Sequence, residues 1–407
     1  MSSIQTADFK FDKIKYNLII NLSLILYLIL INISNIVTTE ESYIFISNIR
    51  NWIIVALVIL IPLIILIYGV PIYFIFGLLI FILWLAYGFI FAKVNGGSIL
   101  IDQSNWNYLI FPNLCGVIIF SYSRIYSNLN FVIFSFFIFQ ILGFILIYYF
   151  NGIDFTTFPK FRLTYFNTDT LYSQGLSKFF GIFSIISLVY FLKTTSKFLR
   201  LIFILGTIFG IFLFLLGGAR GESFFGVLVI SLILFIKFRI KFIMFIIPSG
   251  IIIYSFFNFP QYLDNFILYS RITQVVEGDY GDRDLLFANA INLIKSDWVL
   301  LLFGKGFAYF QNYYNYSFGN YPHNYILEFI ITFGILPTFI FLWLCFKDFP
   351  QFMEKIKSFD LVTFLLLYLF LVDMKSGTLI TSWIINVIAI IRINDIFFQK
   401  KPGLNDK

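Results

Sequence analysis

Long apolar runs alternate with short polar segments along almost the whole chain, a pattern that predicts a bundle of membrane-spanning helices. A helix that crosses a bilayer needs about 20 predominantly apolar residues. We predict twelve spans, of which the fourth, sixth, eighth and eleventh are short: 17–37, 52–69, 71–92, 108–122, 131–150, 179–193, 201–217, 223–236, 242–259, 325–346, 360–374 and 378–395. The expected fold is therefore an all-α integral membrane protein with about twelve transmembrane helices, in which residues 1–407 form a single polytopic domain.

Two longer polar segments, 151–178 and 260–322, interrupt this pattern. Within the second, residues 283–296 predict a short amphipathic helix with Asp282 as its N-cap and with one apolar face formed by Leu286, Ala290, Leu293 and Ile294. The apolar run 298–303 is too short to cross, so we expect it to enter the interface or the mouth of the bundle. A long loop in a compact bundle is usually functional. Residues 260–322 should therefore form a large, partly helical external loop between the ninth and tenth helices, carrying part of the active site.

Composition and charge support this interpretation. The chain is 60% hydrophobic and 12% charged, whereas a soluble domain carries about 25% charged residues. Most of the 28 Lys and Arg residues lie in short loops that face the cytoplasm if the N-terminus is inside. Both termini are then cytoplasmic, and 151–178 and 260–322 lie outside. The net charge of +7 is spread over these loops without a basic patch, so we expect no nucleic-acid partner.

Cysteine and histidine are too scarce to form a metal centre. Cys115 and Cys345 both lie in apolar runs, and His323 is the only histidine. A zinc or iron site needs more ligands of these types than the chain offers. We therefore predict neither a metal nor another cofactor.

Arg220 lies in the glycine-rich segment 217–223, between two predicted spans. A turn this short holds the guanidinium near the outer membrane surface, where a charge is costly and needs a partner. One interpretation is an arginine that snorkels to the interface. The other is an anion site, because the glycines let the backbone approach a ligand closely.

Arg283 begins the predicted amphipathic helix, where a cation opposes the helix dipole at a cost of about 0.3–1 kcal/mol. The neighbouring acids could simply neutralise it, which is the structural alternative to a binding role. These acids are Asp279, Asp282 and Asp284.

His323 immediately precedes the predicted span 325–346. A single histidine at a helix start is often a capping or hydrogen-bonded structural group, but it can also serve as a base. Asn324 and Glu328 follow, four positions apart on one helix face. An acid inside a membrane span is a candidate functional residue, although Glu328 could also do no more than orient Asn324 or pair with an arginine.

The predicted topology places Arg220, Arg283 and His323 on the external face. Two guanidinium groups can bind a pyrophosphate through paired hydrogen bonds. A neutral imidazole can accept a proton from an attacking hydroxyl. The three residues therefore suggest nucleophilic displacement of a phosphorylated leaving group.

The chain resembles the bacterial O-antigen polymerase and O-antigen ligase superfamily of twelve-span enzymes. The resemblance covers residues 217–337, about a third of the chain, and elsewhere only the hydropathy profile agrees. It rests on the order and spacing of several motifs: Gly218-Ala219-Arg220-Gly221, Arg283 at a loop helix, Gly304-Lys305-Gly306-Phe307, His323-Asn324-x-x-Leu327 and Gly334. Arg162 matches, more loosely, an arginine of the earlier external loop. Pro337 stands where a second glycine is common.

This resemblance implies a substrate, an oligosaccharide on undecaprenyl pyrophosphate at the outer face of the bacterial cytoplasmic membrane. Arg220 and Arg283 would bind the pyrophosphate, and His323 would activate the acceptor hydroxyl for inverting attack. The implied substrate-binding residues are Arg162, Asn324, Glu328, Gly304 and Gly306. The lipid bilayer, a chain-length regulator and a flippase are the implied partners, and no nucleotide sugar is required.

Three functions remain open at this point. The first is a polymerase that joins lipid-linked repeat units of an O-antigen, capsule or related polysaccharide. The second is a ligase of the same superfamily, which transfers finished polymer to a lipid A core or a protein. The third is a transporter or flippase of the lipid-linked sugar, which predicts polar residues along a midplane path. The ionisable residues gather at one face instead, so we rank the transporter well below the other two. The motifs do not separate polymerase from ligase, and we favour the polymerase because polymerases are the more diverse and widespread class.

Overall fold

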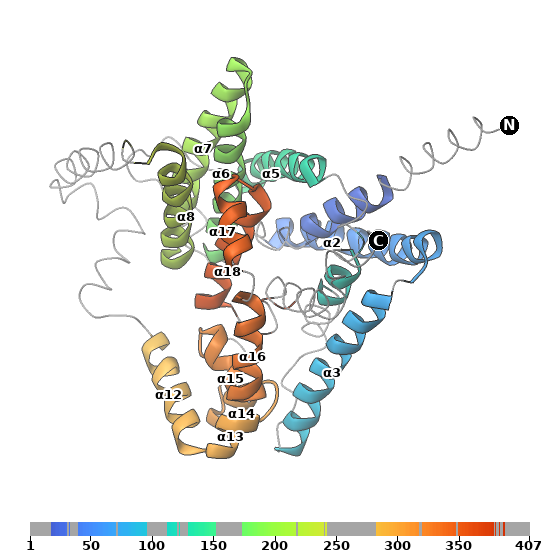
Figure 1. Cartoon of the computed structure of the whole chain (residues 1–407), viewed down its shortest axis with the longest axis vertical. Helices are drawn as coiled ribbons and strands as arrows, with labels where there is room; N and C mark the ends of the chain where they lie inside the picture. Colours follow the sequence, from blue (N-terminus) through green and yellow to red (C-terminus); the bar gives the residue numbers. More distant parts are fainter. Residues whose placement is uncertain are drawn as a thin grey trace, which may run out of the picture.

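The computed structural model describes most of the predicted bundle and part of the large loop. The described residues are 18–30, 32, 40–70, 72–95, 112–119, 122, 129–151, 173–216, 219–239, 241, 282–316, 320–346, 349–377, 379, 382 and 386. Over these residues the chain is almost entirely helical, and they contain no strand (Figure 1). The expected all-α class is confirmed for this part of the chain.

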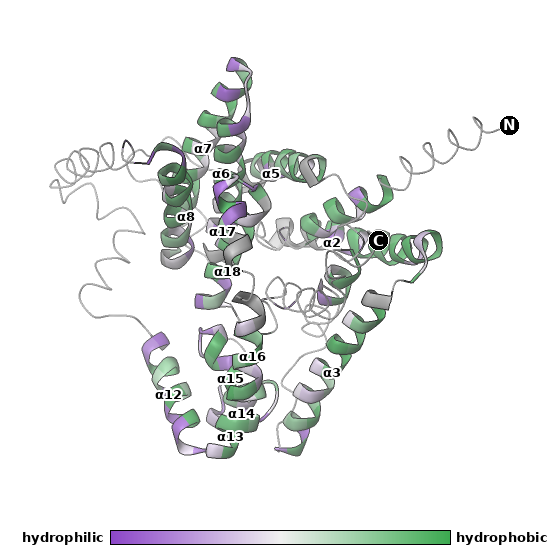
Figure 2. Cartoon of the chain, viewed as in Figure 1, coloured by the Kyte–Doolittle hydropathy of each residue, from purple (hydrophilic) through white to green (hydrophobic). Residues whose placement is uncertain are grey.

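Four helical segments are long and apolar enough to cross a membrane: Asn48–Tyr68, Ile75–Val94, Lys197–Leu215 and Gly221–Phe238. Many of their large side chains face outward, and Trp52 and Leu66 are 73% and 79% exposed. In Figure 2 these helices are coloured hydrophobic over most of their length. A helix that is apolar on all sides is stable where lipid covers it. The protein is therefore membrane-embedded, while the count of twelve spans stays a prediction.

Most of the expected spans that fall on described residues coincide with helices. These are α2 (Glu40–Tyr68), α3 (Ile72–Val94), α5 (Leu129–Asn151), α6 (Ser173–Lys193), α7 (Lys197–Leu216), α8 (Arg220–Phe238) and α18 (Leu361–Ser376). The first and fourth expected spans are represented by helical residues 18–30 and 112–119. The expected span 242–259 lies outside the described residues, as does nearly all of 378–395.

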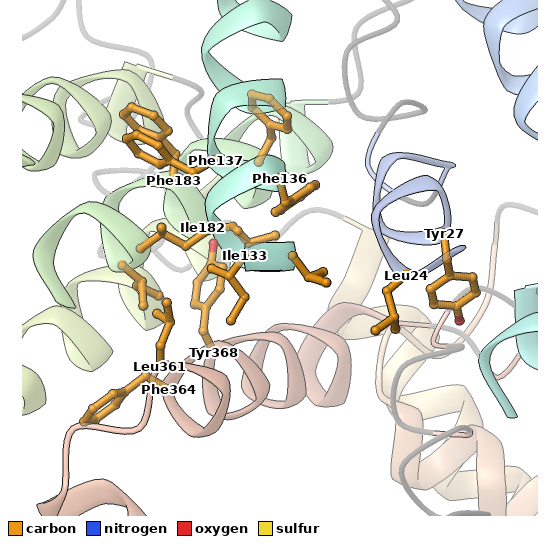
Figure 3. Close-up of a cluster of buried hydrophobic side chains, with 14 of the residues drawn as sticks. Leu24, Tyr27, Ile133, Phe136, Phe137, Ile182, Phe183, Leu361, Phe364 and Tyr368 are labelled. Carbon is orange, nitrogen blue, oxygen red and sulfur yellow. The ribbon is translucent and has the colours of Figure 1, made fainter. Parts of the chain in front are cut away.

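Helix α6 is the centre of the bundle and contacts α5, α7, α8 and α18. Its Phe183 stacks on Phe137 of α5 with ring centroids 4.9 Å apart, and side chains of α18 complete the cluster (Figure 3). On another side, Gly210 of α7 lies against Ser184 of α6. Small residues at such a contact let two helices approach closely in a membrane. This packing fixes the ends of α6, α8 and α18 relative to one another.

The described part of the large loop folds into three helices, α12 (Asp282–Ser296), α13 (Trp298–Phe303) and α14 (Tyr309–Tyr314). The predicted amphipathic helix is confirmed as α12, and its expected apolar face contributes Leu286, Ala290 and Leu293 to a buried cluster. Leu300 of α13 and Ile331 of the following helix α15 (Tyr325–Phe333) complete that cluster with Phe310. The three loop helices therefore form one packed block with α15.

The expected span 325–346 is not one straight helix. Helix α15 ends at Gly334, and α16 (Ile335–Phe346) folds back beside it. The rings of Tyr325 and Phe341 lie 5.8 Å apart, whereas residues this far apart in a straight helix would be separated by about 24 Å. Helices of 9 and 12 residues are about 14 and 18 Å long, too short to cross a hydrocarbon core of about 30 Å. The single expected span is thus replaced by a helical hairpin, followed by α17 (Phe349–Lys357).

The turn of this hairpin gives a stability prediction. Gly334 has φ +88°, and a Cβ at this position would overlap the backbone of Leu302 and Phe303. Gly334→Ala should therefore destabilise the protein by more than the roughly 1–3 kcal/mol that a strained backbone residue costs. Gly69→Ala is the matched control, because Gly69 has φ +73° but open space around it. Thermal unfolding of both variants in detergent should show the larger loss for Gly334→Ala, and equal losses would contradict the packing described here.

Candidate active site

Arg283 and His323 lie at neighbouring ends of packed helices. Arg283 is the second residue of α12, His323 precedes α15, and these two helices contact each other. Burial, together with the charges of Arg283 and Lys375, lowers the pKa of His323 to about 4. The imidazole is therefore neutral at physiological pH and lies within the electrostatic reach of two cations.

The conformation of His323 is unusual. Its φ is +49°, in the left-handed region that non-glycine residues rarely adopt. Its Nδ1 is buried and has no hydrogen-bond partner within the described structure, while the ring lies 4.0 Å from that of Tyr321, measured between centroids. A strained backbone and an unsatisfied buried nitrogen are both costly. Such features are typical of a residue that is held in place for binding or catalysis.

Asn324 and Glu328 hold the start of α15 in place. Asn324 is the N-cap, and its side-chain oxygen accepts a hydrogen bond from the N–H of Leu327 at 3.1 Å. Glu328 is only 8% exposed and accepts a hydrogen bond from the N–H of Leu379 at 3.2 Å. Among the described residues Glu328 therefore holds the chain that follows α18, and it neither orients Asn324 nor pairs with an arginine.

Arg220 is the first residue of α8, but its side chain lies outside what the structure describes. The next residue, Gly221, lies against the side chain of Lys375 near the end of α18, and a Cβ at Gly221 would overlap the Lys375 Nζ. Lys375 is also one of the two cations that act on His323. It therefore connects the start of α8 with the region around His323 and Arg283.

Further charged groups meet at this end of the bundle. Lys178 of α6 forms an ion pair with Asp373 of α18, with Nζ and Oδ1 2.7 Å apart. Glu222, in the first turn of α8, is only 3% exposed. Its backbone carbonyl accepts a hydrogen bond from the Tyr368 hydroxyl at 3.4 Å. The two acids and two lysines keep this junction polar although apolar helices surround it.

Arg283 is not neutralised by its described acidic neighbour. Among the described residues it forms no ion pair, and Asp284 is exposed. Asp279 and the side chain of Asp282 lie outside the described part. Arg283 is partly buried, and its charge acts on His323.

Gly304 and Gly306 have a clear packing role. Both have positive φ, +71° and +93°, and a Cβ on either would overlap backbone atoms of α15 or α3. Lys305 between them forms an ion pair with Asp297, the N-cap of α13, with Nζ and Oδ2 3.1 Å apart. Gly304 therefore packs on α15 and Gly306 attaches the loop block to α3. Their expected contact with substrate stays a prediction. Arg162 lies outside the described residues.

Sequence reasoning missed Lys375, Lys178, Glu222 and Asp373. A signal was present, because Asp373 and Lys375 lie at the external end of the predicted span 360–374 and Lys178 at the end of the external segment 151–178. We interpreted such charges as topology signals, whereas the packing of α6, α8 and α18 brings them together. In the described part of the chain, no group of three or more His, Cys, Asp or Glu residues could hold a metal ion.

Comparison with known proteins adds no identification. No family model matches the chain, and no curated protein or solved structure matches it either. The resemblance drawn from the motifs therefore stays a prediction. The functional argument depends on the geometry around His323.

Proposed function

We propose that this protein is a polymerase of oligosaccharide repeat units linked to undecaprenyl pyrophosphate. It would act at the outer face of the bacterial cytoplasmic membrane, with both termini in the cytoplasm. About twelve membrane segments would form the bundle. The observation that carries this proposal is the neutral, half-buried His323, whose Nδ1 has no described partner and which lies near Arg283 and Lys375.

In the proposed reaction the imidazole of His323 accepts the proton of an acceptor sugar hydroxyl. The hydroxyl oxygen attacks the anomeric carbon of the donor, and the bond from that carbon to the pyrophosphate oxygen breaks. Undecaprenyl pyrophosphate leaves with the electron pair, and the anomeric configuration is inverted. Arg220 and Arg283 bind the departing pyrophosphate, since guanidinium groups match its oxygens in pairs.

The low pKa of His323 has a consequence for this reaction. A general base is most effective when its pKa is near the working pH, whereas burial together with the nearby cations lowers the pKa of His323 to about 4. A bound pyrophosphate would offset these positive charges and raise the pKa of the imidazole. The base would therefore become effective when the donor is bound. Arg162, Asn324 and Glu328 would contribute to the substrate site, the last two by fixing the position of His323.

Deletion of the gene, followed by gel analysis of surface glycans, tests this proposal. A polymerase predicts a single repeat unit capped on the core. Full polymer stranded on the lipid carrier would instead indicate a ligase, and retained polymer in altered amount would favour a transport role. The expected partners, a flippase and a chain-length regulator, should remain unaffected in abundance.

A further inference from the structure

Lys375 lies where two parts of the molecule meet. The first part is the bundle of α6, α8 and α18, in which Lys375 fills the space beside Gly221 left by the missing Cβ. The second is the block of α12 to α16, which places Arg283 and His323 near it. Glu328, on α15, binds the chain four residues beyond Lys375 through the N–H of Leu379. The two parts are therefore joined through the segment that carries this lysine.

The charges around Lys375 come from several helices that meet here. Lys178 and Asp373 compensate each other in their ion pair. Arg283 and Asp284 lie at the start of α12, and Glu222 lies in the first turn of α8 beside Gly221. Two described basic groups, those of Arg283 and Lys375, lie near His323, and they come from different parts of the molecule. An anion bound between them would contact both parts at once.

We propose that Lys375 is a third cation of the pyrophosphate site, binding the diphosphate group between the start of α8 and the region of Arg283 and His323. This inference rests on the proposed function and extends it to a residue that the motifs do not include. A lysine ammonium binds phosphate as a point charge with three rotatable donors. It can follow the diphosphate as the sugar bond breaks, whereas the arginines hold fixed geometry.

The contact with Gly221 favours a binding role for Lys375 over a role in packing alone. If Lys375 only filled space, another long side chain would serve equally well at this position. The first turn of α8, however, offers backbone N–H groups without partners inside the helix, and Gly221 lets the ammonium lie beside them. The same turn begins with Arg220. The Lys375 ammonium and these N–H groups therefore meet at one place.

The single histidine makes this inference directly measurable. Because His323 is the only histidine, protein labelled with ¹³C-histidine in nanodiscs gives one ring signal, and its titration reports the pKa of His323. In the wild type we expect that pKa to be near 4 and to rise when inorganic pyrophosphate binds, because the anion offsets the charges of Arg283 and Lys375. Lys375→Met should raise the pKa without any ligand and weaken pyrophosphate binding roughly tenfold or more.

Three further variants separate charge from packing. Lys375→Arg should retain binding, because it keeps the charge. Gly221→Ala should weaken binding, because its Cβ excludes the ammonium from α8 while the charge remains on the chain. Lys295→Met, at an exposed position of α12, is the matched control. It should change neither the pKa of His323 nor the affinity for pyrophosphate.

The outcomes distinguish this inference from the proposed function. If the wild-type signal does not respond to pyrophosphate, the pyrophosphate site itself is wrong, and the proposed function fails with it. If the wild type responds and Lys375→Met binds pyrophosphate as tightly, with an unchanged His323 titration, the inference about Lys375 is wrong while the proposed function stands.

Discussion

His323→Ala should abolish polymer formation while the protein remains in the membrane at a near-normal level. Loss of a general base typically lowers the rate by about 10²–10⁴-fold, which removes visible polymer from a surface-glycan gel. The fold should persist, because the described structure gives the Nδ1 of His323 no hydrogen bond to lose. Gel analysis of glycans and immunoblotting of membranes from the same cells measure both quantities.

A second substitution controls for the backbone at this position. The φ of His323 is +49°, and asparagine adopts this region more readily than alanine does. His323→Asn should therefore keep the local conformation and still lack the base, so it too should make no polymer. Normal-length polysaccharide from either variant would remove His323 from the catalytic role.

Arg283→Ala is expected to be almost as damaging, and for an electrostatic reason. An arginine that stabilises the negative charge of a phosphate group in the transition state can contribute about 10³–10⁵-fold to the rate. Arg283→Lys should recover only part of this activity, since an ammonium cannot make the paired hydrogen bonds of a guanidinium. Glycan gels and the rate of undecaprenyl pyrophosphate release measure the effect.

The thermal stability of Arg283→Ala distinguishes a catalytic role of Arg283 from a structural one. A cation in the first turn opposes the dipole of α12, so removing Arg283 should leave the helix as stable as before or more stable by about 0.3–1 kcal/mol. Lys295→Ala, in the last turn of the same helix, should keep full activity. Loss of stability that parallels the loss of activity in Arg283→Ala would show that Arg283 serves the fold.

The helices that the sequence predicted best are those with an unambiguous pattern. Uninterrupted apolar runs located α3 and α7, and the spacing of Leu286, Ala290 and Leu293 located α12. The hairpin at Gly334 was missed because α15 and α16 are both apolar and together have the length of one span. The fold-back depends on the φ of one glycine and on its contact with α13, neither of which is visible in hydropathy.

The residues of the candidate site also divide into those that the sequence reveals and those that only the packing reveals. Arg283 and His323 could be selected because a charge and a single histidine in a polar loop are conspicuous in so apolar a chain. Lys375 could not, because its proximity to Gly221 depends on how α8 and α18 pack. Sequence position gives the membrane face of such a residue, whereas only tertiary packing gives its neighbours.

The most direct test of the central claim is a reaction with the purified protein alone. The protein in nanodiscs is incubated with undecaprenyl pyrophosphate bearing one oligosaccharide repeat, and both products are separated by chromatography. We predict a ladder of longer oligosaccharides and release of one undecaprenyl pyrophosphate for each bond formed, with neither product from His323→Ala. A donor that stays intact with the wild-type protein, when its repeat unit is the one that the cell polymerises, would contradict the proposed function.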